Sequence, residues 1–163
     1  MVERVTAPDG MHEKKAQGYA LRLLKFRPRS TDEVRRKMLG KGYPALLIEN
    51  VIAGLVRTGL LDDPAFTRAW LSCRLQRPMG LRRVTQELKD KGISAEIVQK
   101  EWDQLRTDYN EFEMVAAVVQ KRIGRYSDLD PVKRNRRMTD YLLRRGFSAD
   151  VIYKVFSAGR KGS

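Results

Sequence analysis

An internal repeat of about 50 residues constrains the fold of this chain more than any other feature. Three glycines, Gly42, Gly92 and Gly146, lie 50 and 54 residues apart. A large apolar residue follows each glycine and another stands four positions before it: Tyr43, Ile93 and Phe147 follow, and Met38, Leu88 and Leu142 precede. Such a glycine typically ends a helix in the left-handed conformation, and the next apolar residue packs back onto that helix. The pattern predicts three copies of one structural unit.

Each copy is predicted to contain three helices, because apolar residues recur at helical spacing and no strand-like alternation is present. A capping box formed by Ser30 and Glu33 marks one helix start, and Asp108 is expected to cap the seventh helix. The expected organisation is a flexible tail, three repeats and a basic tail, at residues 1–13, 14–58, 59–107, 108–158 and 159–163. A unit of this size buries little core alone. Stacking should therefore give an elongated, curved all-α array of the right-handed type with a long groove.

Residues 59–66 connect the first two repeats. Gly59 is expected to end one helix and Asp63 to cap the next, with Pro64 at the first helical position. The buried face of this fourth helix is predicted to comprise Phe66, Ala69, Trp70 and Cys73. The adjacent pair Asp62 and Asp63 could instead bind a metal or act in acid–base catalysis. Adjacent side chains point in different directions, however, so we favour the cap.

The residue inventory argues against an enzyme. The 163 residues include one histidine, His12, and one cysteine, Cys73, so the usual ligands of a zinc site and any Cys–His or Ser–His pair beyond His12 are lacking. No glycine-rich phosphate-binding loop is present. No apolar run approaches the roughly 20 residues of a membrane span, and residues 1–12 lack the apolar centre of a signal peptide. We therefore expect a monomeric, cytoplasmic protein with no catalytic residue, no metal and no cofactor.

The net charge of +13 is concentrated at the two ends of the chain. Residues 1–61 carry a net charge of +6 and residues 119–163 a net charge of +8, whereas residues 62–118 carry −1. This distribution favours contact with a polyanion at the ends and a different kind of contact in the middle. A basic surface that only keeps the protein soluble is the alternative.

Two groups of basic residues are candidates for binding. The first brackets the turn at residues 78–80 and comprises Arg74, Arg77, Arg82 and Arg83. These guanidinium groups could bind DNA phosphates or the carboxylates of a partner protein, each with two hydrogen bonds. The second group follows the seventh helix and comprises Arg125, Lys133, Arg134, Arg136, Arg137, Arg144 and Arg145. Its charge density favours phosphate contact through counterion release, although for either group a solvated face without a ligand is the alternative.

Several segments together carry a resemblance to a known family. They are Gly59-Leu60-Leu61-Asp62-Asp63 followed by Phe66, then Arg74, Gly80, Arg82-Arg83 and Gln86-Glu87-Leu88-Lys89-Asp90-Lys91-Gly92-Ile93, together with Ser30 to Lys41. With these motifs the chain resembles the RecX family of recombinase regulators. The resemblance covers roughly residues 16–158 and is most specific in the second repeat. Pro78-Met79 departs from the basic or glycine-containing tripeptide that is more usual there.

The resemblance implies a non-enzymatic crescent of three tandem repeats that engages the groove of the RecA filament on single-stranded DNA. It implies dampened ATP hydrolysis, strand exchange and co-protease activity of RecA in recombination and the SOS response. The residues expected to contact RecA are Arg68, Arg74, Arg77, Arg82, Arg83, Lys89 and Lys91, and the second basic group is expected to approach single- or double-stranded DNA. A stand-alone nucleic-acid-binding protein of helix-turn-helix-like repeats is the alternative, against which the neutral middle repeat argues. A hydrolase or nuclease lacks a supporting set of ligands.

Overall fold

The structure is a computed structural model that describes residues 9–160. These residues form nine α-helices and two short 3-10 helices and contain no strand, which confirms the all-α prediction. Repeat 1 contains α1 (Asp9–Phe26), α2 (Thr31–Gly40) and α3 (Ala45–Arg57); repeat 2 contains α4 (Asp63–Leu75), α5 (Leu81–Asp90) and α6 (Ala95–Leu105); repeat 3 contains α7 (Glu111–Arg122), α8 (Pro131–Arg144) and α9 (Ala149–Arg160). The 3-10 helix η1 (Arg106–Asp108) links repeats 2 and 3, and η2 (Ile123–Tyr126) follows α7.

The two ends of the chain are more helical than expected. Helix α1 begins at Asp9, inside the segment expected to be a flexible tail, because Met11 to Lys15 are mostly strong helix formers. Helix α9 continues to Arg160, so it includes the start of the expected basic tail. The remaining residues of both tails lie outside the described part of the chain.

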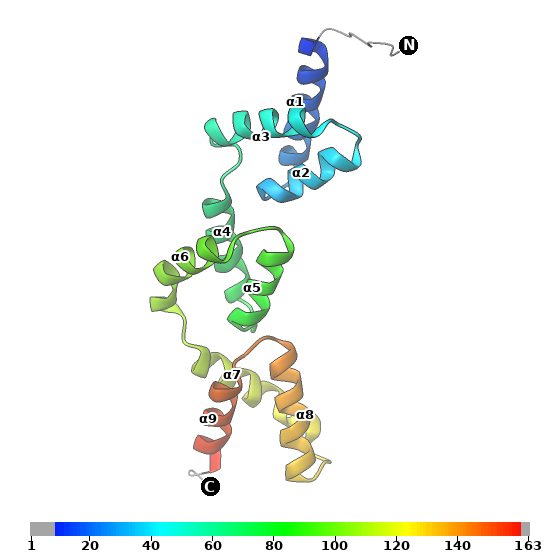
Figure 1. The fold of residues 1–163 in the computed structure, drawn as a ribbon. Helices are drawn as coiled ribbons and strands as arrows, with labels where there is room; N and C mark the ends of the chain where they lie inside the picture. The colour runs from blue at the N-terminus through cyan, green and yellow to red at the C-terminus, as the bar shows by residue number, and fades with distance from the viewer. Residues whose placement is uncertain (1–8, 161–163) are drawn as a thin grey trace.

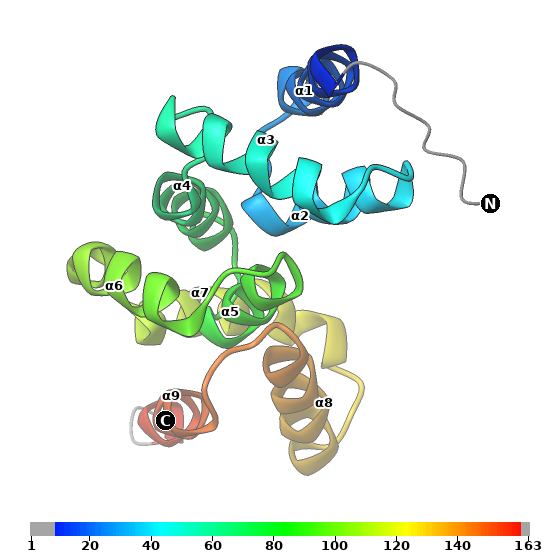
Figure 2. The same cartoon turned by 45° about the horizontal axis from the view of Figure 1, so that its top comes forward.

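Each repeat has its own hydrophobic core. Repeat 1 buries Ala16, Ala20, Val34, Met38, Ile48, Val51, Ile52, Leu55 and Leu61; repeat 2 buries Phe66, Leu71, Val84, Leu88, Ile93 and Val98; repeat 3 buries Val115, Val118, Met138, Leu142, Phe147, Ile152 and Val155. Figures 1 and 2 show the repeats as successive layers along one long axis, with the two ends of the chain at opposite ends. The molecule is therefore a stack of small cores and not a single globule.

The glycines that defined the repeat have the predicted conformation. Gly42, Gly92 and Gly146 follow the second helix of each repeat with φ values of 90°, 76° and 86°. Gly59, which follows α3, has a φ of 71°. A residue with a side chain rarely adopts these values, so the glycines allow the chain to reverse sharply after each of these helices.

Two predicted helix caps were assigned to the wrong residues. Asp62 is the N-cap of α4, since its carboxylate accepts a hydrogen bond from the Ala65 N–H at 2.8 Å. Asp63 is the first residue of α4, and its carboxylate accepts a hydrogen bond from the N–H of Thr31 in repeat 1. Asn110 caps α7, with its side-chain oxygen accepting from the Glu113 N–H at 3.2 Å. Asp108 belongs to η1, because a short 3-10 turn that the periodicity did not predict precedes α7.

The buried face of α4 also differs from the prediction. Phe66 is buried and Trp70 is half-buried, but Ala69 and Cys73 are exposed. Thr67 and Leu71 are fully buried in their place. Helix α4 packs against both α5 and α6, which moves the centre of its buried face around the helix by one residue.

The second helices of the three repeats follow one another along the stack (Figure 1). The start of α2 meets the end of α5, where the Ser30 hydroxyl donates to the Lys91 carbonyl at 2.5 Å. The start of α5 meets the end of α8 in the same way, and the Gly80 N–H donates to the Arg145 carbonyl at 2.9 Å. These two junctions place side chains from different repeats side by side and so position the candidate site.

Candidate partner-binding surface

A cavity of about 300 Å³ lies at the junction of repeats 2 and 3. Its lining, which we call the arginine cleft, consists of Met79, Arg83, Tyr141, Arg144 and Arg145. Arg83 comes from the first turn of α5, whereas Arg144 and Arg145 come from the end of α8. The cleft has no acidic lining residue, so it is suited to a phosphate or a carboxylate.

The arginine cleft is held in shape by contacts of its own residues. The Arg145 guanidinium lies 5.3 Å from the centre of the Tyr141 ring and donates to the Pro78 carbonyl at 3.4 Å. Arg83 is 57% exposed, with a long contact of 3.6 Å to Glu87. Arg144 is exposed. Two of the three arginines are therefore available to a ligand.

The cleft joins residues that the sequence analysis had assigned to different partners. Arg83 was expected to contact RecA, and Arg144 and Arg145 were expected to approach nucleic acid. Because the end of α8 docks on the start of α5, all three lie around one cavity. Arg77 and Arg82 flank the turn at residues 78–80, whose Gly80 N–H bonds to the end of α8. Both side chains are exposed and have no ion pair within the described residues. Both could extend a basic surface beyond the cleft.

A different role is evident around Trp70 in repeat 2. The Arg74 guanidinium and the Lys91 ammonium lie 4.6 Å and 4.4 Å from the centre of the Trp70 rings. Glu87 accepts hydrogen bonds from the Trp70 indole N–H at 3.2 Å and pairs with Arg74 at 2.9 Å. Cation–π contacts and ion pairs in a half-buried setting fix these side chains. Arg74 is thus occupied by contacts with Trp70 and Glu87 inside repeat 2 and is not free to bind a partner.

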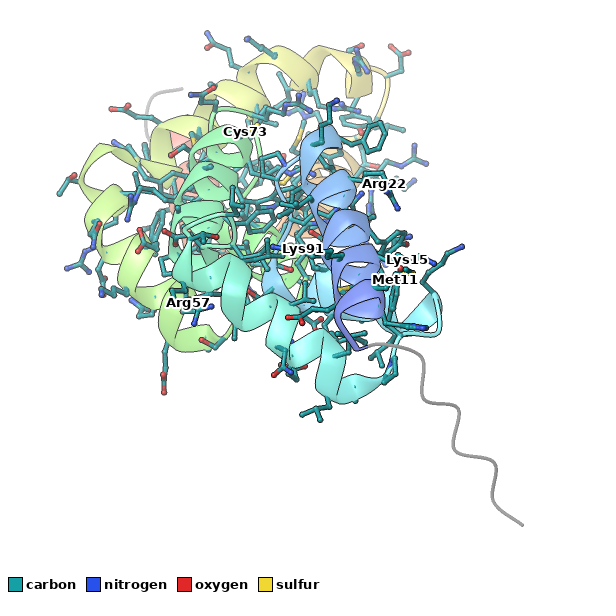
Figure 3. All side chains as sticks on the ribbon, turned by 90° about the horizontal axis from the view of Figure 1, so that it is seen from above. Met11, Lys15, Arg22, Arg57, Cys73 and Lys91 are labelled. Atoms are coloured by element: carbon teal, nitrogen blue, oxygen red, sulfur yellow. The ribbon has the colours of Figure 1, made fainter. Side chains whose placement is uncertain are left out.

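Lys91 and Arg68 are also paired inside the molecule. Lys91 contacts Glu33 of repeat 1 at 3.2 Å, so it links two repeats. Figure 3, which looks along the stack, shows Lys91 near the middle of the projection and Arg22 on α1 nearer its edge. Arg68 contacts the carboxylate of Glu101 at 2.8 Å, and the Glu101 side chain is only 2% exposed. Its guanidinium compensates a buried charge, which would otherwise be costly.

The charge of Glu33 is stabilised by three donors. Burial raises the pKa of this carboxyl, but hydrogen bonds from Arg27, Lys91 and the Ser30 N–H outweigh that effect and hold the pKa at about 2. Arg27 binds it with two hydrogen bonds of 2.8 Å and 3.2 Å. Glu33 is therefore ionised under ordinary conditions and connects α1, α2 and the end of α5.

Asp63 completes the junction between repeats 1 and 2. Its carboxylate accepts a hydrogen bond from the N–H of Thr31, the first residue of α2, at 2.8 Å. At the junction of repeats 2 and 3, Tyr109 lies near the backbone of Leu81, the first residue of α5, and burial raises the pKa of its hydroxyl. Asp62 and Asp63 thus both accept backbone N–H groups. No group of three or more metal-ligating side chains occurs within residues 9–160.

The remaining predicted residues lie mostly on exposed surfaces. Lys89 is exposed on α5, without an ion pair among the described side chains. Arg125 is exposed in η2, and the exposed Lys133 contacts Asp130 in its own helix at 3.5 Å. Arg136 and Arg137 are exposed on α8, whereas Arg134 is half-buried. This part of α8 presents a basic surface to solvent.

A second basic cavity, which the sequence pattern did not predict, lies in repeat 1. It has a volume of about 520 Å³ and lies between the end of α1 and helix α2. Its lining consists of Tyr19, Arg27, Arg29, Glu33, Arg36, Lys37, Gly40 and Lys41. The net charge of +6 on residues 1–61 was the available signal. The cavity could not be predicted from the pattern because its basic residues come from the connection after α1 and from α2 and its end, which are separated in the sequence.

Comparisons with known proteins agree with this architecture. Three family domains, described as the first, second and third three-helix domains of RecX, match residues 16–55, 62–100 and 108–156. No helix in the described part of the chain is long and apolar enough to cross a membrane.

Curated relatives and a solved structure cover most of the chain. "Regulatory protein RecX" of Pelodictyon phaeoclathratiforme is 35% identical over 133 residues, 81% of this chain and 81% of that protein. The protein of the same name from Chlorobium limicola is 34% identical over 148 residues, 90% of this chain and 91% of that protein. The crystal structure of RecX from Lactobacillus salivarius has the same fold, with a TM-score of 0.81 at 23% identity over 91% of this chain and 97% of that one. Three matching domains in the expected order, together with these relatives, show that the chain belongs to the RecX family.

Proposed function

We propose that this protein binds the RecA recombinase filament on single-stranded DNA and restrains its ATP hydrolysis, strand exchange and co-protease activity. Membership of a family whose curated members are named regulatory proteins supports this proposal. The stacked form supports it as well, because an extended array of repeats suits a partner that is itself long and repetitive. The protein acts by binding and not by catalysis.

The observation that carries the proposal is the arginine cleft with Arg77 and Arg82 beside it. The guanidinium groups of Arg83, Arg144 and Arg145 come from two repeats and line one cavity, and Arg77 and Arg82 are exposed nearby in the sequence. In the middle of the stack, by contrast, the basic side chains of Arg74 and Lys91 are satisfied by internal carboxylates. Exposed arginines at the junction of repeats 2 and 3, and paired basic residues elsewhere in repeat 2, mean that only a partner with acidic groups at matching positions would bind well.

The two basic groups then divide between protein and nucleic acid. Arg77, Arg82 and Arg83 contact acidic side chains of RecA across adjacent protomers. The exposed basic residues of α8 approach the DNA phosphates or a further protomer, where they release counterions. Arg68, Arg74 and Lys91 hold the surface in shape.

The direct test is a titration of RecA ATPase activity on single-stranded DNA with the full-length protein. We expect the rate of ATP hydrolysis to fall as the protein is added. A rate that does not change at any concentration of protein would refute the proposal.

The role of the arginine cleft is tested by charge reversal. The variant R82E/R83E should shift the inhibition curve to at least about tenfold higher protein concentration, since two charge-assisted contacts of about 1 kcal/mol each are lost and replaced by repulsion. The matched control is K100E/K154E, which makes the same change in net charge at exposed lysines of α6 and α9. Equal inhibition by both variants would exclude the cleft as the RecA contact.

The purified protein can also be used to test the alternative function, stand-alone binding of nucleic acid. A stand-alone nucleic-acid-binding protein would bind naked single- or double-stranded DNA tightly at physiological salt, measured by fluorescence anisotropy without RecA. We expect only weak binding with a steep dependence on salt. The balanced charge of repeat 2 supports this expectation, because each repeat of such a protein would need its own basic face.

A further inference from the structure

The ends of α5 and α8 are docking sites for a helix within this molecule. At the end of α5, the Asp32 side chain lies against Gly92, where a side chain on the glycine would collide with it. The Ser30 hydroxyl donates to the Lys91 carbonyl at 2.5 Å, and Glu33 pairs with the Lys91 ammonium at 3.2 Å. The first turn of α2 therefore occupies this helix end with a cap residue and two carboxylates.

The end of α8 is occupied in the same way. Gly146 lies against the backbone of Arg83, again with no room for a side chain. The Gly80 N–H, at the start of α5, donates to the Arg145 carbonyl at 2.9 Å. In both junctions the left-handed glycine lets the first turn of a neighbouring helix approach closely, through the Asp32 side chain at Gly92 and through the Arg83 backbone at Gly146. The residue before each glycine accepts a hydrogen bond with its carbonyl.

The end of α2 corresponds in the repeat to the ends of α5 and α8 and has the same left-handed glycine. No other helix start among the described residues packs against it. Gly42 has a φ of 90°, and the position of its missing side chain has nothing within 4 Å. Lys41 occupies the position of Lys91, is exposed, and its carbonyl accepts no hydrogen bond from the described residues. Lys37 is exposed one turn earlier. The third copy of the docking site is therefore complete and vacant.

The charges around this site indicate its occupant. The start of α8 is the one second-helix start that no neighbouring repeat covers within the described chain, so a second copy of this protein would offer it. That start already has its N–H groups capped by Asp130, at 3.0 Å to both Val132 and Lys133, and it presents Lys133. It would bring a cation to Lys41. An acidic first turn, like the one that α2 presents to Lys91, complements the lysines.

We propose that the end of α2, from Gly40 to Tyr43, is a docking site for the start of a helix in a partner protein, whose first turn carries a polar cap residue and acidic side chains. The partner's cap residue donates to the Lys41 carbonyl, as Ser30 does to Lys91. Its carboxylates pair with the ammonium groups of Lys41 and Lys37. This interaction is independent of the RecA contact proposed above, because it concerns a different end of the molecule.

The probe is a peptide with the sequence of residues 28–39 of this chain, because those residues form the helix start that docks at Lys91. A covalent staple between solvent-facing positions of the peptide would keep it helical, since short isolated helices are marginal in water. It is titrated into the full-length, nitrogen-15-labelled protein while the amide NMR signals are followed. The expected result is a saturable shift of the amides of Lys41, Gly42 and Tyr43. A second peptide, with the positions of Asp32 and Glu33 changed to Asn and Gln, should bind more weakly.

Variants of the protein locate the contact. K41E should weaken binding of the peptide of residues 28–39, whose first turn carries the two carboxylates, by about two- to fivefold, the effect of one exposed ion pair. K41Q should give a smaller loss, and the matched control K100E should bind as the unchanged protein does. An unaltered amide spectrum elsewhere shows that each variant is folded.

Three outcomes would overturn the proposal. They are shifts confined to other parts of the molecule, equal binding of the peptides with and without the two carboxylates, and shifts at Lys41 and Gly42 that grow with protein concentration before any peptide is added. The last result would identify a second copy as the occupant. Each outcome leaves the RecA titration unaffected, so the two proposals can fail separately.

Discussion

At the scale of single residues, Glu33 shows how one carboxylate organises a junction. It lies where α1, α2 and the end of α5 meet, and it accepts hydrogen bonds from Arg27, Lys91 and the Ser30 N–H. It is also half of the capping box that starts α2. Local helix formation and contact between repeats therefore depend on the same ionised group.

This arrangement predicts a pH dependence of stability. The pKa of Glu33 is about 2 in the folded protein and 4.5 for an unperturbed carboxyl. Because the folded pKa is the lower one, the stabilisation is fully present above about pH 4.5 and is lost as the pH falls towards about 2. We expect E33Q to unfold with a free energy about 1 kcal/mol lower than the unchanged protein at about pH 6, after allowance for solvent screening.

The measurement is urea unfolding of both proteins at about pH 6 and about pH 3. The difference in free energy should shrink at the lower pH, because the Glu33 carboxyl is then protonated in the unfolded chain and must lose its proton on folding. E96Q, at an exposed glutamate in the first turn of α6, is the control and should show no such convergence. A difference that stays constant with pH would contradict the prediction.

The residues of the first junction also show what the sequence could and could not predict. The capping box of Ser30 and Glu33 was predicted, because its two halves lie within one turn. The cap of α4 was assigned to Asp63 instead of Asp62, because adjacent aspartates have the same chemistry. The contact of Asp63 with the N–H of Thr31 in the neighbouring repeat cannot be predicted from local patterns.

At the scale of helices, the close contact between α5 and α8 depends on two glycines. A side chain on Gly80 would collide with the backbone of Gly146. A side chain on Gly146 would collide with Arg83 and would also be strained by its φ of 86°. The two helices can approach this closely only because neither residue carries a β-carbon.

We therefore expect G80A to destabilise the junction of repeats 2 and 3. The added methyl group must push α5 and α8 apart, which costs about 1–3 kcal/mol and lengthens the hydrogen bond to the Arg145 carbonyl. The variant should also open the arginine cleft. The free energy of unfolding and the amide shifts of residues around the cleft are the measurements.

G40A is a suitable comparison, because Gly40 is helical and has open space around it. It should be neutral or stabilising by up to about 1 kcal/mol, since alanine is the better helix former. If G80A and G40A had equal stability, the two helices would not be in backbone contact in solution.

The positions of the helices were largely predictable, while their exact faces were not. The glycines at the helix ends and the apolar spacing defined the helices. In α4 the predicted inner residues Ala69 and Cys73 proved exposed, because packing against both α5 and α6 shifts the buried face towards Thr67 and Leu71. Packing against two neighbours is decided by the tertiary structure.

At the scale of the whole molecule, the three repeats have separate cores, so we expect a core substitution to destabilise its own repeat more than the others. Leu142 is fully buried in the core of repeat 3, and L142A should cost about 2–5 kcal/mol. In a stack, each repeat is stabilised by its own core and by its neighbours. We expect amide exchange in repeat 3 to accelerate most, with a smaller effect in repeat 2 and the least in repeat 1.

Hydrogen exchange followed by mass spectrometry would measure this gradient. L143A, at the next residue, is the matched control, because Leu143 is 42% exposed and its removal should leave the exchange nearly unchanged. A uniform acceleration across all three repeats in L142A would show that the molecule unfolds as a single unit.

The candidate site was predictable only as a set of charges. Arg77, Arg82 and Arg83 were identified from their spacing around a turn. Their assembly with Arg144 and Arg145 depends on the docking of α5 on α8, more than 60 residues away in sequence. The basic cavity of repeat 1 was missed for the same reason, because its walls come from two helices. Local patterns show which residues are charged, and the stacking of repeats decides which of them meet.

The junctions between the repeats have a further consequence for spacing. At both junctions the main-chain carbonyl at the end of one helix accepts a hydrogen bond from the start of the next. The second junction joins main chain to main chain, whereas the first also uses the side chains of Ser30, Glu33 and Asp63. Substitutions of exposed side chains away from these junctions should therefore change what the repeats recognise without changing the distance between them. We therefore expect the spacing of the three repeats to be a fixed property of the fold, which a repetitive partner would have to match.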